Sequence, residues 1–109
     1  MFKTRIFDRK WKVFLHTGDR FAKRFGGGDA AVTLPGLKEM HFCEDELDIV
    51  TVIHECVHAY FDGMNTSAAK LSLDQQEEVF CELFANSGQT ILKHGRILLR
   101  DLQDERDRR

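Results

Sequence analysis

The sequence predicts a small α+β fold, in which a three- to four-stranded antiparallel or mixed sheet packs on two long helices and is followed by a C-terminal amphipathic helix. Short segments that alternate apolar and charged residues fill the first part of the chain, as expected for strands. After residue 44 the apolar residues recur at helical spacing instead. The 109 residues leave room for one domain with one core, so we treat residues 1–109 as a single domain.

The sheet is predicted from residues 1–43. Phe2–Phe7 and Trp11–His16 alternate in polarity and are separated by three residues, which suits a hairpin. Gly18–Phe25 has apolar residues at helical spacing and predicts a short helix that ends at a run of three glycines. Ala31–Leu34 and Leu37–Cys43 flank a Pro-Gly pair, which is typical of a turn whose glycine has a positive φ. We therefore expect two hairpins in one sheet.

The first long helix is predicted over residues 44–62, with acidic side chains at its N-terminus, where they interact favourably with the helix dipole. Its centre reads His54, Glu55, Cys, Val, His58. Residues four apart lie on one face of a helix, so the two imidazoles can bind one metal while Glu55 lies beside it, toward a bound water. A catalytic zinc has three protein ligands and an open position for water. A third ligand must therefore come from another part of the chain.

The second long helix, residues 73–94 with Asp74 as a possible N-cap, carries three candidate ligands, Glu77, Glu78 and Glu82. On a helical wheel Glu77 falls within the apolar arc, whereas the other two project with polar residues. A carboxylate in an apolar environment needs a partner or a metal. We predict Glu77 as the third ligand, with Glu82 as the next choice. The alternative is that Glu77 lies at the edge of the arc and reaches water.

Residues 96–109 have leucines among alternating charges and predict an amphipathic tail helix that packs on the domain or on another subunit, so the oligomeric state stays open. The cysteines, Cys43, Cys56 and Cys81, are odd in number and lie in apolar segments, and no secretory signal precedes them. We expect reduced thiols, with Cys56 and Cys81 in the core. No apolar run is long enough to cross a bilayer, so we expect a cytoplasmic protein without a membrane partner.

Charge is distributed unevenly along the chain. Residues 1–28 carry eight basic side chains against two acidic ones, and residues 29–94 carry three basic against twelve acidic. The basic segment could contact nucleic acid or an acidic partner. A solvated strand face is the favoured explanation, so a nucleic-acid partner is possible but not favoured.

The motif from His54 to His58, followed by eighteen residues and then Glu77, resembles that of the gluzincin family of zinc metallopeptidases, in which the third ligand comes from a separate glutamate helix. In size the chain is most similar to the single-domain minigluzincins and to small HExxH proteins of phage and prokaryotic genomes. The resemblance implies one catalytic Zn²⁺ and a peptide or protein substrate. It also implies that the substrate lies antiparallel to an exposed edge strand, for which Leu37–Cys43 is the candidate.

We therefore expect a zinc metallopeptidase in which His54, His58 and Glu77 hold the metal and Glu55 is the general base. The alternative is a non-hydrolytic, zinc-stabilised module that binds a protein or nucleic acid. Glu55 favours the peptidase, because a structural zinc site does not need a base. The short chain favours the alternative, because it lacks the C-terminal subdomain that supplies an oxyanion-stabilising histidine in thermolysin-like enzymes. Possible replacements for that histidine are His41, Tyr60 and His94.

Overall fold

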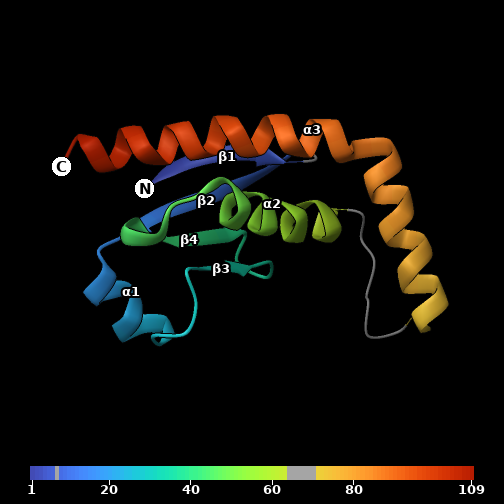
Figure 1. Ribbon diagram of the computed structural model, residues 1–109, viewed down its shortest axis with the longest axis horizontal. Coiled ribbons are helices and arrows are strands. Elements are labelled where there is room, and N and C mark those ends of the chain that lie inside the picture. The colour runs from blue at the N-terminus through green and yellow to red at the C-terminus, as the bar shows by residue number, and fades with distance from the viewer. Residues whose placement is uncertain (7, 64–70) are drawn as a thin grey trace.

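The computed structural model describes residues 1–6, 8–63 and 71–109. Phe7, the last residue expected in the first strand, lies outside the described residues. The elements in chain order are β1 (Phe2–Ile6), β2 (Arg9–His16), α1 (Gly18–Phe25), β3 (Ala31–Leu34), β4 (Glu39–Cys43), the short 3-10 helix η1 (Glu44–Glu46), α2 (Ile49–Gly63) and α3 (Leu73–Asp107). The expected α+β class is confirmed, with a four-stranded mixed sheet and three α-helices in the described part of the chain (Figure 1).

The sheet has the strand order β1-β2-β4-β3. Both expected hairpins are confirmed, because β1 pairs with β2 and β3 pairs with β4 in antiparallel fashion. The two hairpins join through a parallel pairing of β2 with β4. This pairing makes β4 an interior strand, so the expectation that Leu37–Cys43 is an exposed edge strand is wrong. The edge beside α2 is β3 (Figure 1).

The turn between β3 and β4 also differs from the prediction. Two overlapping turns close it, with Leu37 N donating to Leu34 O at 3.1 Å and Lys38 N donating to Pro35 O at 3.2 Å. The residue with a positive φ is Lys38, at 53°, rather than the glycine of the Pro-Gly pair. As a result β4 begins at Glu39, two residues later than expected.

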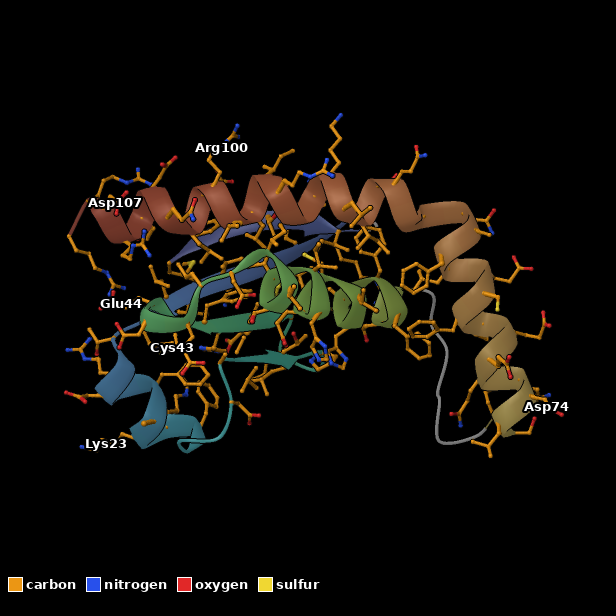
Figure 2. The ribbon with its side chains drawn as sticks, viewed as in Figure 1. Lys23, Cys43, Glu44, Asp74, Arg100 and Asp107 are labelled. Atoms are coloured by element: carbon orange, nitrogen blue, oxygen red, sulfur yellow. The ribbon has the colours of Figure 1, made fainter. Side chains whose placement is uncertain are left out.

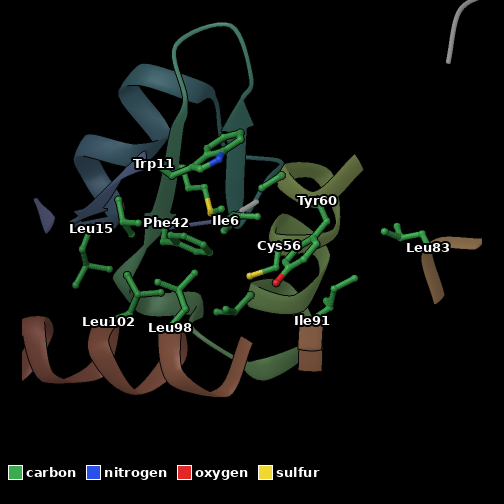
Figure 3. Close-up of a cluster of buried hydrophobic side chains, with 14 residues drawn as sticks. Ile6, Trp11, Leu15, Phe42, Cys56, Tyr60, Leu83, Ile91, Leu98 and Leu102 are labelled. Atoms are coloured by element: carbon green, nitrogen blue, oxygen red, sulfur yellow. The ribbon is translucent and has the colours of Figure 1, made fainter. Parts of the chain in front are cut away.

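The core lies between one face of the sheet and the two long helices. Figure 3 shows Trp11 of β2 and Phe42 of β4 meeting Cys56 and Tyr60 of α2 and Leu98 of α3. Trp11, Cys56 and Phe42 are completely buried. Alternate residues of β2 and β4 point to the opposite face, which α1 covers only in part.

Helix α2 begins at Ile49, later than residue 44, because the acidic residues 44–46 form η1. Asp48 then caps α2, and its Oδ1 accepts a hydrogen bond from Thr51 N at 2.7 Å. The helix ends at Gly63, one residue beyond the expected end. It carries the His54 to His58 motif in its central turns.

The two helices expected at residues 73–94 and 96–109 form a single helix, α3. Ser72 rather than Asp74 is its N-cap, in a capping box with Gln75. Gly95, which was expected to separate the two helices, is buried inside α3 against α2. A Cβ at this position would lie 2.8 Å from Ile53 Cγ1, so the glycine allows the two helices to pack closely.

Figure 1 shows that α3 bends in its orange part. The second half lies along the domain, where Leu98 and Leu102 are buried, as expected for a tail that packs on the domain. Its end lies beside Glu44 (Figure 2), which accepts a hydrogen bond from Arg109 Nη1 at 2.7 Å. Arg109 Nη2 also donates to Leu15 O. The first half of α3 turns away from the sheet.

The structure divides the cysteines differently from the prediction. Cys56 is completely buried in the core, as expected, and Cys43 is also buried. The prediction for Cys81 is wrong, because it lies exposed on the first half of α3. All three are free thiols. No helix among the described residues combines the length and apolar character that crossing a membrane requires.

Candidate metal centre

His54 and His58 lie exposed on the same face of α2, as their spacing predicts. Their Nε2 atoms are 3.2 Å apart, and the two rings meet edge to face at 72°. Two nitrogens that bind one tetrahedral zinc, each about 2.0–2.1 Å from the metal, are separated by about 3.4 Å. The imidazole pair is thus close to the spacing of two nitrogens on one zinc ion, and the same distance allows a hydrogen bond between the two rings.

Glu55 lies beside this pair but is buried, with only 6% of its surface exposed. Its Oε1 accepts a hydrogen bond from Thr33 Oγ1 of β3 at 2.6 Å, and its Oε2 lies 3.9 Å from His54 Nε2. The contact between β3 and α2 thus fixes the carboxylate on the side of the helix that faces the edge strand. A hollow of about 260 Å³ opens there, and its walls include Ala31, Thr51, His54 and Glu55.

A larger cavity of about 490 Å³ lies on the other side of the histidines, between α2 and the first half of α3. Gln76 and Phe80 of α3 line it together with His54, His58 and Phe61 of α2. The histidine pair therefore lies between two open spaces, one bordered by the edge strand β3 and one by α3.

The third ligand is not in place in the described conformation. Among residues 1–6, 8–63 and 71–109, no three His, Cys, Asp or Glu side chains are close enough to hold one metal ion. Glu77, Glu78 and Glu82 are all exposed on α3. The expectation that Glu77 lies in a buried apolar arc is wrong, because the arc itself is only partly covered: Phe80 and Phe84 are 47% and 52% exposed. The assignment of Glu77 as a ligand stays a prediction.

The three candidates for an oxyanion-stabilising group lie elsewhere. His41 alternates with core residues of β4 and so occupies the sheet face opposite α2, where burial lowers its pKa. Tyr60 is 5% exposed and faces His94, with ring centroids 6.2 Å apart. His94 Nε2 is 2.9 Å from Thr4 Oγ1 on β1, the strand farthest from β3. Burial raises the pKa of Tyr60 and lowers that of His94.

Cys56 is part of the same motif but has a structural environment. Burial, with a smaller contribution from the charge of Glu55, raises the pKa of its thiol to about 12. The thiol is therefore protonated at neutral pH and is not a nucleophile, as expected for a core cysteine.

Two polar arrangements were not anticipated. One is the contact of Thr33 with Glu55, for which a single threonine in a short strand gives no sequence signal. The other is a chain in which His16 Nε2 lies 2.8 Å from His41 Nδ1, and His41 Nε2 lies 2.9 Å from Glu39 Oε1. The alternation of Glu39 and His41 along one strand could have indicated the second contact, because residues two apart share a face.

Comparisons of the chain with protein-family models, with curated proteins and with solved structures found no match.

Proposed function

We propose that the protein is a zinc-dependent peptidase in which His54, His58 and Glu77 hold the metal and Glu55 acts as the general base. The observation that carries this proposal is the position of Glu55, buried and hydrogen-bonded beside an exposed imidazole pair whose Nε2 atoms are 3.2 Å apart. A structural zinc site is closed by four ligands and has no need of a separate carboxylate beside it.

The choice of Glu77 rests on the helical geometry of α3. Gln76 and Phe80 line the cavity with the histidines and so define the side of α3 that faces them. At about 100° per residue, Glu77 lies about 80° from the middle of this side, whereas Glu78 and Glu82 lie about 180° and 140° away. Glu77 is thus the glutamate that needs the smallest rotation of the helix to face the pair.

The same rotation exchanges one aromatic side chain of α3 for another. At about 100° per residue, Phe84 would move from about 60° to about 20° from the middle of the side that faces the histidines, whereas Phe80 would move from about 20° to about 60°. Leu73 would stay about 40° away, so apolar burial neither favours nor opposes the rotation. Two imidazoles and one carboxylate form a donor set that suits zinc.

The residues around the centre have separate roles in the proposed reaction. Zinc held there would supply Lewis acidity and would lower the pKa of a water molecule. Glu55 would take a proton from the water that attacks the peptide carbonyl, and would return it to the amine that is released when the C–N bond breaks. Thr33 holds Oε1 of Glu55 and leaves Oε2 on the side of His54. The edge strand β3, rather than β4, offers unpaired backbone groups to an extended peptide substrate.

We further propose a cytoplasmic location, because the three cysteines are free thiols and two of them are buried. A protein of this kind acts on a peptide or an unfolded protein segment that can lie extended along β3.

Zinc content and peptide cleavage test the proposal together. We expect the purified protein to bind one zinc ion and to cleave an unfolded substrate such as reduced casein. Glu55→Gln should keep the zinc and lose at least about 100-fold in kcat, as is typical when a general base is removed. Bound zinc without cleavage by the wild type would reject the peptidase.

The ligand assignment has its own matched pair of variants. Glu77→Gln should lose zinc, whereas Glu82→Gln, which changes the same charge on the same helix, should keep it. The opposite result would identify Glu82 as the ligand. Retention of zinc by both variants would exclude Glu77 and Glu82, and would leave Glu78 or a residue outside this helix as the third ligand.

A further inference from the structure

The sheet face opposite α2 carries a quartet of basic side chains. Lys3 and Arg5 of β1 lie directly opposite Lys12 and Lys10 of β2 in the antiparallel register. All four alternate along their strands with residues of the core face, and all four are exposed. We call Lys3, Arg5, Lys10 and Lys12 the basic quartet.

None of the basic quartet forms an ion pair within the described residues, 1–6, 8–63 and 71–109. Like charges directly opposite each other destabilise a sheet. Glu39, which is opposite Lys12 on β4, is instead 2.9 Å from His41 Nε2.

Arg9 at the start of β2 provides an internal comparison. Its side chain pairs with Asp62 of α2 at 3.3 Å. The fold therefore neutralises a cation of this hairpin that lies near α2 and leaves the four on the open face unpaired. Their charge remains available to an external anion.

Aromatic rings continue the same face beyond the quartet. On β2, Lys10 and Lys12 are followed by Phe14 and His16 at two-residue spacing, so this row is about 20 Å long. The half-buried ring of Phe14 stacks on His41, with centroids 4.6 Å apart and planes 6° from parallel. At the far end of the row, α1 places Arg24 over the ring of Phe25, 5.1 Å from its centroid.

We propose that this face binds single-stranded nucleic acid, with backbone phosphates on the basic quartet and a base stacked at Phe14. Cations that follow an extended backbone and aromatic rings that accept any base are the two features of sequence-tolerant single-strand binding. An acidic peptide would satisfy the cations but would leave the aromatic continuation without a role. The face lies on the opposite side of the sheet from His54 and His58, so the proposal does not depend on the peptidase.

Fluorescence anisotropy with a labelled 20-nucleotide oligo(dT) measures the proposed interaction. With four phosphate contacts, the plot of log K against log salt concentration should have a slope of about −2.8, which weakens binding roughly 50-fold between about 50 and 200 mM salt. Arg5→Gln/Lys12→Gln should reduce the slope to about −1.4. Lys93→Gln/Arg96→Gln removes one lysine and one arginine from the exposed side of α3 and should change neither affinity nor slope.

Phe14→Leu tests the stacked base and should weaken binding by about tenfold, within the range found for base stacking on aromatic side chains. Circular dichroism establishes that each variant is folded before its affinity is compared. Absence of binding at about 50 mM salt, or equal losses in the quartet and control variants, would overturn the proposal. Competition by poly-glutamate as effective as that by unlabelled oligo(dT) would instead identify the face as a site for an acidic protein. An unchanged affinity in Phe14→Leu would refute the stacked base.

Discussion

Replacement of Thr33 by valine should destabilise the protein although the two side chains have almost the same shape. The Thr33 hydroxyl donates to Glu55 Oε1 at 2.6 Å, and Glu55 is only 6% exposed, so solvent cannot easily replace the lost donor. Hydrogen bonds to charged groups contribute about 1.5–3 kcal/mol. For a 109-residue chain the entropy of unfolding is about 0.23 kcal/mol/K, so a loss of about 2 kcal/mol lowers the Tm by about 9 °C.

Urea and thermal unfolding followed by circular dichroism measure this loss. Thr33→Ser is the matched control, because it keeps the hydroxyl and removes one methyl group; it should cost less than about 1 kcal/mol. Equal stability of Thr33→Val and the wild type would show that the hydrogen bond does not hold Glu55. If Glu55 is the general base, Thr33→Val should also lower kcat while KM changes little, because the hydroxyl orients the base and does not bind substrate.

Two further predictions concern packing and pH. Gly95→Ala should lower the free energy of unfolding by about 1–3 kcal/mol, because the new methyl group would lie 2.8 Å from Ile53 Cγ1. Gly88→Ala is the control and should raise the free energy of unfolding by about 0.5–1 kcal/mol, because its Cβ would meet its nearest neighbour at 3.7 Å. If urea unfolding shows a change of the same sign for both variants, the close packing at Gly95 is contradicted. Burial lowers the pKa of both His16 and His41 below 6.5 in the folded protein. As the pH falls below 6.5, these histidines therefore take up protons in the unfolded chain before they do so in the folded protein. The free energy of unfolding that is present above pH 6.5 should fall as the pH drops below that value. Urea midpoints measured from about pH 7.5 to 5.5 should fall less in His16→Gln than in the wild type, and parallel curves would refute this origin.

The local elements of the fold were accessible from the sequence, and the contacts between distant segments were not. Alternation of polarity and a short turn are enough to indicate each hairpin. The parallel pairing of β2 with β4 has no local signal, because it depends on how the chain crosses from one hairpin to the other. Without that pairing, the sequence predicts that β4 is an edge strand and does not indicate that β3 borders α2.

Gly95 shows the same limit for helices. A glycine after a long apolar-periodic segment is a common helix stop, and a glycine where two helices pack closely has the same appearance in sequence. Only the partner residue, Ile53, distinguishes the two cases.

In the candidate site, too, the contacts within one helix can be predicted from the sequence, and the contacts between elements cannot. His54, Glu55 and His58 belong to one helix, and their relative placement follows from its geometry alone. The environment of Glu77 does not follow from helix geometry. A helical wheel shows which residues share a side of a helix, but it does not show whether another element covers that side. The contact of Thr33 with Glu55 joins residues 22 positions apart and depends on the sheet topology.

The two halves of α3 differ in what holds them, and this difference bears on how the proposed metal centre forms. The second half is fixed by buried Ile91, Leu98 and Leu102, whereas the first half buries Leu83 but leaves Phe84 largely exposed. A ligand that binds only one of two arrangements stabilises that arrangement by about 2.7 kcal/mol when the free ligand concentration is one hundred times the dissociation constant. Under the proposed function, zinc would supply this free energy for the rotated first half of α3. The centre is then assembled on binding, so its zinc affinity contains the cost of turning the helix as well as the gain from the third ligand.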